Sequence, residues 1–514
     1  MDDARTWSHA FLFRPHGAGS RRHLDERFSA PEVLKSIRRK FGVTHRVLDV
    51  LVPEPSLQRP CVVAGVRQGI AAAMPQHVRS SDRIVRAEKL VSSDRSSRYT
   101  QREAILSGDY SRFPFDPRRN YSGVLLQQGR TLLDQDGNEQ SAMASRGFRA
   151  AVMDVLGRVF LATPGAFKIE SDGRGGLTIG RGRIYVDGLV AENHGAGDPV
   201  WDAALDEQYG AEPVSFTQQP YLPAGPELPH SGEPCLIYLD VWQREVTGVE
   251  DFDLADPSFK AADTTTRIQT VWQVKLREVS SAGARRTLEE DCKFAPSASR
   301  LSTALAGYTG AENQLYRVEV HNKGRAGTAT FKWSRENAST VARVTRLTDL
   351  SHIVVQAFGV PLSGFSAGDL IEIIDEAREF SGHPGELRRI KSIDAGSSGF
   401  TLDTPFNPGL FPTDQNGVPD VTSHMRVRRW QGTGAIQGRS WIDLENGIAI
   451  RFEADPTDRC FRTGDYWLIP ARVANRSIEP LDRAPPRGIH HHFVKLALFT
   501  PPRRLRDLRG LVKR

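Results

Sequence analysis

Cysteine is scarce in this 514-residue chain, which contains only four. The four are widely scattered, and no two of them form a C-x-x-C pair. This spacing excludes a zinc ribbon and a dense disulfide framework. We therefore expect buried thiols outside disulfides at Cys61, Cys235, Cys292 and Cys460.

Long apolar runs are also missing, because no stretch of about 18 apolar residues occurs in the chain. The N-terminal sequence MDDARTWSHA lacks the basic region and the apolar stretch of a secretory signal peptide. These two absences predict a protein that does not insert into a membrane.

Signatures of catalysis and of cofactor binding are absent as well. The sequence contains neither H-E-x-x-H nor G-x-S-x-G. Its most glycine-rich segment, GRGGLTIGRGR at residues 173–183, is not a phosphate-binding loop, because no G-x-x-x-x-G-K-[ST] pattern accompanies it. We interpret that segment as a turn-rich hairpin and predict a protein that is not an enzyme and has no cofactor.

Charge is unevenly distributed along the chain. The formal net charge is +6, but residues 1–105 hold 19 Lys and Arg against 11 Asp and Glu, which leaves 49 against 51 in the remainder. A nucleic-acid-binding protein more often carries its basic patch on a folded domain. The near-neutral body therefore argues against a nucleic-acid partner.

The first 105 residues are rich in Arg and Ser and contain only modest apolar pieces. They can be read as an additional docking module or basic arm. They can equally be an upstream extension of the gene, with translation starting at a codon read here as Leu106 and followed by Ser107. On the second reading the segment is dispensable or absent from the mature protein.

The most informative stretch runs from Asp109 to Glu139. Two prolines and alternating aromatic and charged residues favour an extended segment over a helix in its first part. A helix follows, with Asp136 as its N-cap and Glu139 three residues later. Apolar residues at helical spacing predict a stripe that packs against a sheet or a partner helix: Phe148, Val152, Val155, Leu156 and Val159.

Prolines remove backbone hydrogen-bond donors from the extended segment, so its side chains must supply much of any contact that it makes. We predict that residues 112–130 form an attachment strap against a neighbouring subunit. Its predicted interface residues are Arg112, Phe113, Phe115, Tyr121, Gln127, Gln128 and Arg130.

Several motifs of this stretch occur in the same order in a known family. They are DYSR at 109–112, QQGR at 127–130 and the acidic DQDGNE at 134–139. Later pieces are YLDVWQREVT from Tyr238, TRIQTVWQVKL from Thr266, NQLYRVEVHNKG from Asn313, ATFKWSREN from Ala329, GDYWLIPAR from Gly464 and PPRGIHHHFVKLAL from Pro485. Over about residues 107–500 the chain resembles the bacterial family designated domain of unknown function 6519.

The resemblance implies a component of a particle, because members of that family commonly lie among phage-tail-like and contractile-injection genes. It assigns no activity. The expected partners are other subunits of the particle, and we expect a homo-oligomer, with a trimer as the specific hypothesis. We expect synthesis and assembly in the cytoplasm, followed by an extracellular location only as part of a particle.

Short β-prone runs dominate the rest of the sequence and predict a mainly β, multi-domain antiparallel fold: a hairpin meander followed by sandwich-like or barrel-like domains. In the strand 236–246, Ile237, Leu239 and Val241 face one way, while Tyr238 and Trp242 face the other. The expected divisions are a basic extension (1–105), an attachment arm with one amphipathic helix (106–165), a first β domain with a long loop at 195–233 (166–280), a second β region of one or two subdomains (312–500) and a basic tail (501–514).

Three groups of residues are candidates for chemistry. His490 and His492 share a strand face and could bind a metal, but no third ligand accompanies them, and hydrogen-bonded structural histidines are the preferred interpretation. Asp443 and Glu445 could flank a sugar as a hydrolytic pair, although an acidic hairpin lip is the simpler interpretation. Aromatic candidates for stacking on a glycan are Trp242, Trp333 and Trp441, with core packing as the alternative.

These observations favour a structural or adaptor component of a phage-tail-like or contractile injection particle, in a baseplate or fibre-attachment role. The alternative is a glycan-binding or glycan-cleaving β protein of the same particle. A binding module needs an exposed aromatic platform, and a hydrolase needs a cleft that holds two carboxyl groups. Burial of Trp242, Trp333 or Trp441 would therefore weaken the hypothesis of a glycan-binding module.

Overall fold

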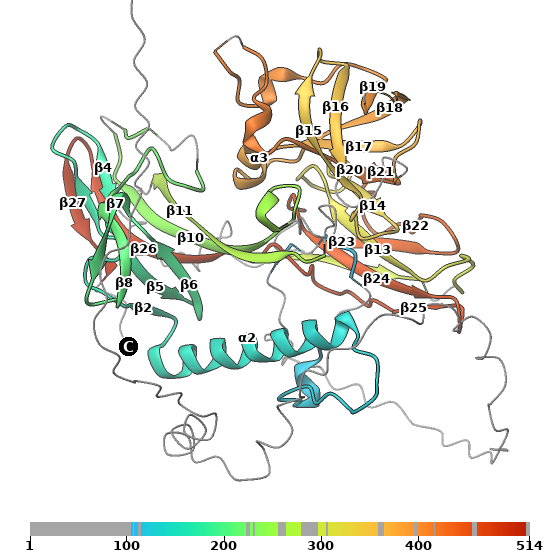
Figure 1. The fold of residues 1–514 in the computed structure, drawn as a ribbon, viewed down its shortest axis with the longest axis horizontal. Helices are drawn as coiled ribbons and strands as arrows, with labels where there is room; N and C mark the ends of the chain where they lie inside the picture. Colours follow the sequence, from blue (N-terminus) through green and yellow to red (C-terminus); the bar gives the residue numbers. More distant parts are fainter. Residues whose placement is uncertain are drawn as a thin grey trace, which may run out of the picture. The chain divides into compact units, whose positions relative to one another are not determined.

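The structure is a computed structural model, and it describes residues 104–509 with internal gaps. The gaps are at 106, 111–114, 223–226, 230–231, 255–263, 279–296, 305–306, 358–363, 395, 397, 416 and 455–459. Antiparallel strands dominate this part of the chain, as predicted (Figure 1). No helix in it combines the length and the apolar character that a membrane crossing requires.

The longest strands form a sheet centred on β10 (Cys235–Val246). β10 pairs along its whole length with β11 (Arg267–Glu278), and on its other edge with β26 (His492–Thr500) and β1 (Ala104–Ile105). The predicted alternation is confirmed, because Ile237, Leu239 and Val241 lie in one core cluster and Trp242 lies in another. Both faces of β10 are therefore buried.

Short sheets complete the first core. Their strands are β2 (Val159–Leu161), β3 (Ile169–Ser171), β4 (Leu177–Ile179), β5 (Gly182–Val186), β6 (Leu189–Asn193) and β9 (Val214–Ser215). The two predicted hairpins are present, but they lie in separate sheets: β3 pairs with β4, and β5 pairs with β6 across Asp187-Gly188, where both residues have a positive φ. Their inward side chains join those of β10 in one cluster.

Three expectations about the divisions of the chain need correction. Residues 195–233 are not simply a loop, because β7 (Ala196–Asp202) and β8 (Glu207–Glu212) pair as a hairpin held by backbone hydrogen bonds. Few side chains of this hairpin are buried, so the sequence shows no apolar alternation that predicts it. The last strand of the expected second region, β26, belongs to the first sheet. The expected basic tail contributes β27 (Arg504–Asp507), which pairs with β26.

A second core lies between two further sheets. One contains β12 (Ser299–Thr303), β22 (Ile442–Asp443) and β23 (Ala449–Ala454); the other contains β13 (Gln314–Val320), β14 (Thr330–Ser334), β21 (Gly432–Ala435), β24 (Tyr466–Arg472) and β25 (Ser477–Ile478). Apolar side chains from both sheets form a single cluster. This packing is the sandwich that the strand pattern predicts.

A closed six-stranded barrel is inserted into that sandwich between β14 and β21. Its strands are β15 (Val341–Leu347), β16 (His352–Ala357), β17 (Leu370–Ile374), β18 (Glu386–Asp394), β19 (Gly399–Leu402) and β20 (Arg426–Trp430). The barrel has its own core cluster and carries the short helix α3 (Glu376–Phe380). The chain thus leaves the sandwich after β14 and re-enters it after β20, so two connections lie side by side.

The arm and helix α2 (Asp134–Leu156) precede the β regions. The helix begins three residues earlier than predicted, because its N-cap is Leu133, which makes no side-chain hydrogen bond. Asp136 therefore lies in the first turn and not at the cap. An acidic first turn complements the positive end of the helix dipole without a capping box. Val152 of the predicted stripe is buried, but Phe148 and Val155 are exposed.

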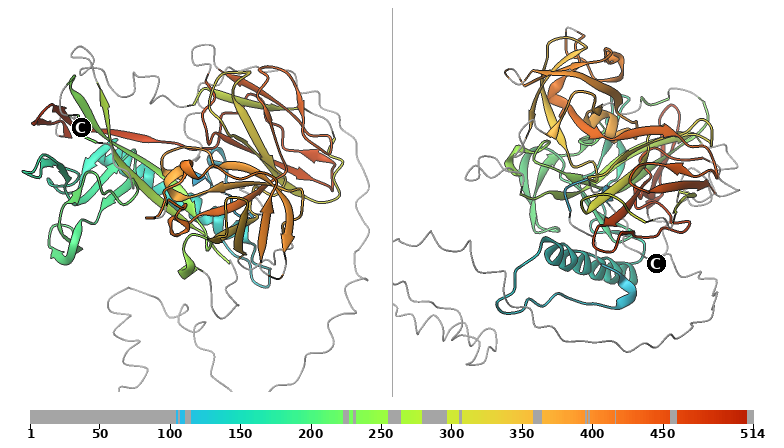
Figure 2. Two further views of the ribbon diagram at one scale, coloured as in Figure 1. Left: turned by 90° about the horizontal axis from the view of Figure 1, so that it is seen from above. Right: turned by 90° about the vertical axis from the view of Figure 1, so that its right-hand side faces the viewer.

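The arm runs back beside the first half of this helix (Figure 2). The Gln140 side chain accepts a hydrogen bond from the backbone N–H of Val124 at 2.7 Å. Short 3-10 turns occur here and elsewhere: η3 (Pro117–Arg119), η4 (Phe252–Leu254), η9 (Pro408–Leu410) and η10 (Val421–Ser423). From Tyr121 to Leu133 the described arm contains no helix or strand.

Asp465 is a buried carboxyl group immediately before β24. It accepts hydrogen bonds from the hydroxyls of Ser297 and Ser299, both of which lead into β12. Burial raises the pKa of Asp465 to about 6, although these hydrogen bonds act in the opposite direction. The folded state therefore retains a proton that the unfolded chain releases near pH 4.

We predict that Asp465 makes the protein less stable as the pH rises. The contribution of Asp465 to the free energy of unfolding falls by roughly 3 kcal/mol between about pH 4 and about pH 6, because the carboxyl group loses its proton at a lower pH in the unfolded state. Asp465→Asn should remove this dependence and raise the free energy of unfolding at pH 7 relative to the natural protein. Urea unfolding at about pH 4.5, 6 and 7 measures the difference. Asp443→Asn at an exposed strand position is the control. Identical pH slopes for the natural protein and Asp465→Asn would contradict the assignment.

Candidate functional site

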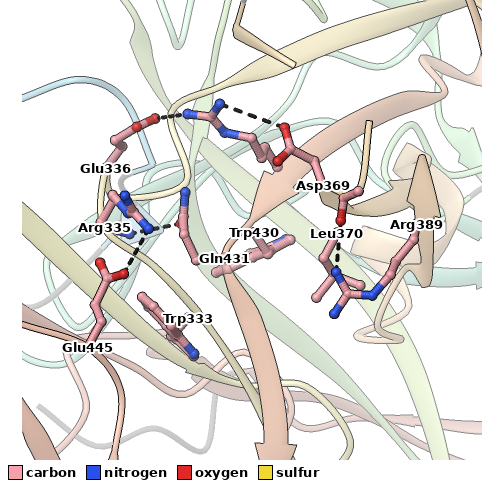
Figure 3. Close-up of a pocket in the computed structure, with 11 residues that line it drawn as sticks. Trp333, Arg335, Glu336, Asp369, Leu370, Arg389, Trp430, Gln431 and Glu445 are labelled. Atoms are coloured by element: carbon pink, nitrogen blue, oxygen red, sulfur yellow. Dashed lines mark hydrogen bonds and ion pairs between the residues drawn. The ribbon is translucent and has the colours of Figure 1, made fainter. Parts of the chain in front are cut away.

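A pocket of about 350 Å³ opens where the two connections between the sandwich and the barrel lie together (Figure 3). The outgoing connection contributes Trp333, at the end of β14, with Arg335 and Glu336 just after it. The returning connection contributes residues 429–431. Because the barrel is inserted at this point, residues almost one hundred positions apart line one cavity.

The Trp333 ring forms an aromatic wall of this cavity. Tyr316 of β13 stacks against it, with ring centroids 6.1 Å apart and an interplanar angle of 23°. Gly432 allows the indole to lie where it does, because a Cβ at that position would be 2.6 Å from Trp333 Nε1. One ring face is thus supported by protein, and the half-buried indole borders the pocket.

Charged side chains form most of the remaining lining, and they occur in pairs. Arg335 Nη2 lies 2.8 Å from Glu445 Oε2, and the backbone N–H of Arg335 donates to Gln431 Oε1 at 2.9 Å. Arg429 forms an ion pair with Glu336 and lies 3.9 Å from Asp369.

Arg389 of β18 lies on the far side of the pocket from Glu445 (Figure 3). One of its guanidinium nitrogens donates to the Gly368 carbonyl at 2.8 Å. The lining therefore contains three guanidinium groups and three carboxylates, together with one amide and two indoles. Its formal charges cancel.

A buried ion pair lies beneath the pocket and joins its two sides. Lys332 Nζ of β14 contacts both carboxylate oxygens of Glu372 of β17 at 2.6 Å. Trp430 Nε1 of β20 donates to Glu372 Oε2 at 3.0 Å, and the Gly385 N–H donates to Oε1 at 3.0 Å. Burial opposes ionisation of Glu372, but Lys332 outweighs it and holds its pKa at about 2.

This arrangement suits a ligand that both donates and accepts hydrogen bonds. A guanidinium donates only, a carboxylate accepts only, and their pairing places both functions within reach of one small molecule. Apart from Trp333, Trp430 and Leu370, the lining residues are polar, charged or glycine, so little apolar surface is available for a hydrophobic ligand. The site is therefore fitted for polar recognition next to an aromatic surface.

The three tryptophans proposed for glycan stacking have different environments. Trp242 is 4% exposed and packs with Val271 and Phe380. Its proposed role in glycan stacking is therefore wrong. The physical reason is that α3 covers the face of β10 that bears Trp242. Trp441 is 47% exposed, with the Arg451 guanidinium 4.8 Å above its ring. Of the three, Trp333 lines the pocket.

The histidine-rich segment at the start of β26 makes hydrogen bonds to two carboxylates. His492 Nδ1 lies 2.8 Å from Asp187, and His491 Nδ1 lies 2.7 Å from Asp240. Among the residues that the structure describes, no group of three or more His, Cys, Asp or Glu side chains could hold a metal ion.

The proposed carboxylate pair of Asp443 and Glu445 lies at a hairpin. Asp443 ends β22, and the backbone N–H of Leu444 donates a hydrogen bond to the carbonyl of Ile448, which closes the turn that leads into β23. Glu445 accepts from Tyr316 Oη at 2.8 Å, besides contacting Arg335. It therefore belongs to the pocket as a hydrogen-bonding residue at the lip of a hairpin.

The predicted strap residues are only partly described. Arg112 and Phe113 lie outside the described residues, and Phe115 is half-buried. Tyr121 and the QQGR residues Gln127, Gln128 and Arg130 are exposed.

The sequence alone did not single out the arginines of the pocket, nor Glu336, Asp369 and Gln431. One signal was present: Trp333 is followed by the polar run SREN, and Trp430 is preceded by RVRR, which contains three arginines. Nothing local indicates that these two runs meet, because their contact depends on the barrel inserted between them.

The chain was also compared with known proteins. The chain matches a protein family described as "Family of unknown function (DUF6519)" over residues 106–297 and 288–485. No curated protein and no solved structure matches the chain.

We predict that Trp430→Phe destabilises the protein by about 1–3 kcal/mol, because the buried Glu372 carboxylate loses a hydrogen-bond donor while an aromatic ring is kept. Urea unfolding at pH 7 measures the change. Trp441→Phe is the matched control and should alter the free energy of unfolding by no more than about 0.5 kcal/mol, because the side chain is exposed. Equal effects of the two substitutions would contradict the importance of the Glu372 contact.

Proposed function

The chain belongs to the DUF6519 family of unknown function, and from this membership and its exposed arm we propose that it is a structural or adaptor component of a phage-tail-like or contractile injection particle. The particle context rests on the family resemblance. The attachment role rests on the arm, which is the observation that carries the proposal.

Apolar side chains of the arm are exposed in close succession. Leu125 is 92% exposed and Leu126 is 68% exposed; the others are Tyr121, Leu132 and Leu133. Exposed apolar residues that occur singly need no explanation, but contiguous ones mark interaction surfaces. We propose that this segment, residues 121–133, packs against another subunit of the particle.

The start of the arm is fixed to the β body. The Ser107 N–H and the Tyr110 hydroxyl both donate to the Glu245 carboxylate on β10. Asn337 Nδ2 donates to the Gly108 carbonyl at 2.9 Å. An anchored base and an exposed apolar segment together form an attachment device, because force on the arm is transmitted to the central strand.

Glycan binding is the second candidate function, and the Trp333 pocket favours it. Binding has more support than cleavage, because Glu336 and Glu445 are already engaged by Arg429 and Arg335. A hydrolytic pair needs one carboxyl group free to transfer a proton to the leaving oxygen. We therefore propose a binding role for this pocket if glycans are its ligands.

We predict that replacing Leu125 and Leu126 together with Asp leaves the protein folded but prevents its incorporation into particles. Both side chains are exposed, so the change costs little stability, whereas a buried interface would then contain unpaired charges. Purified particles from a strain carrying this variant can be examined by mass spectrometry and electron microscopy.

Val418→Asp is the matched control, because Val418 is an exposed apolar residue outside the arm. The control should incorporate normally. Normal incorporation of the double variant would contradict the attachment role of the arm, and intact particles of natural composition and appearance from a strain lacking the gene would contradict the structural function itself.

A further inference from the structure

We propose that the Trp333 pocket binds a single residue of a neutral, hydroxyl-rich carbohydrate. This inference names the ligand class and the residues for the glycan-binding function, and it rests on that function and not on the attachment role of the arm. Three properties of the pocket carry it: its size and polarity, its aromatic wall and its balance of charge.

Size and polarity restrict the class of ligand. A volume of about 350 Å³ lies at the lower end of the roughly 300–1,000 Å³ that is usual for small-molecule sites. Such sites are generally lined by apolar side chains with a few polar groups, whereas this one has the opposite composition. A small ligand with many hydrogen-bonding groups fits, and an apolar ligand would leave charged groups desolvated without compensation.

The aromatic wall suits a pyranose ring. A sugar ring presents C–H groups on its faces and hydroxyls around its edge, and an indole offers a flat apolar surface of similar extent. Tyr316 supports one face of Trp333, and Gly432 leaves room at its edge, so the indole is held in place before a ligand arrives. A surface fixed in advance loses little conformational entropy on binding.

The charge balance favours a neutral sugar over an acidic one. Arg335 and Arg429 are each paired with a carboxylate, so an added anion would compete with Glu445, Glu336 and Asp369. A hydroxyl avoids this competition, because it can donate to a carboxylate while it accepts from the neighbouring guanidinium. Vicinal hydroxyls therefore match the alternating donors and acceptors of the lining.

Ligand access is consistent with this inference. Arg389 is exposed at one wall, and Trp333, Arg335 and Gln431 are half-buried, so the lining is in contact with solvent. The protein below the pocket is fully buried, with Trp430 and Glu372 at 2% exposure each. A rigid base and an accessible opening suit the recognition of a terminal or branching sugar residue.

Titration calorimetry and saturation-transfer NMR with the full chain test the inference. The probes are the methyl glycosides of glucose, galactose, mannose and N-acetylglucosamine, with glucuronate as the acidic probe. At least one neutral glycoside should bind, and glucuronate should bind at least about tenfold more weakly, which corresponds to roughly 1.4 kcal/mol. Trp333→Ala should weaken binding about tenfold or more, and Trp333→Tyr should restore part of it.

Asp369→Asn provides a second variant in case Trp333→Ala fails to fold, and it should also weaken binding, because it removes a charged acceptor from the wall. Trp441→Ala, outside the pocket, should bind as the natural protein does. Stronger binding of glucuronate would overturn the assignment to neutral sugars. Binding that is unchanged by Trp333→Ala and Asp369→Asn would overturn the site but leave glycan binding intact, and no binding by any probe would overturn both.

Discussion

The buried ion pair between Lys332 and Glu372 is the interaction on which the arrangement of the barrel and the sandwich depends. Both side chains are at most 5% exposed, so solvent screens their charges little. Removing one partner of such a pair typically costs 3–5 kcal/mol, because the other charge remains buried without compensation. Replacing such a pair with apolar residues is often neutral or stabilising, so we infer that its role here is to determine which strands meet.

The position of the pair explains the pocket above it. Lys332 precedes Trp333 on β14, and Glu372 lies two residues after Leu370 on β17, so fixing the pair also fixes the two walls. A second ionic contact holds the barrel to β10, where Arg244 lies 2.9 Å from Glu376 of α3. With two such contacts, the inserted barrel has a defined orientation at the point where its connections form a site.

Strand patterns allowed much of the fold to be predicted. Period-two alternation correctly placed the inward face of β10, and turn dipeptides marked the hairpin at Asp187-Gly188. The burial of the second face of β10 was not predictable from the sequence. An alternating strand pattern does not show whether the other face meets protein or water. The same limit applied to the tryptophans: Trp242 and Trp333 are chemically identical candidates, and only tertiary contacts make one a core residue and the other a wall of a pocket.

A double-mutant cycle on Lys332→Met and Glu372→Gln tests most directly whether this ion pair holds the barrel against the sandwich. Unfolding free energies of the natural protein, both single variants and the double variant give the coupling energy. We predict a coupling of about 2 kcal/mol or more, against less than about 1 kcal/mol for the exposed pair of Arg118 and Asp116. A coupling below about 0.5 kcal/mol for Lys332 and Glu372 would contradict the account.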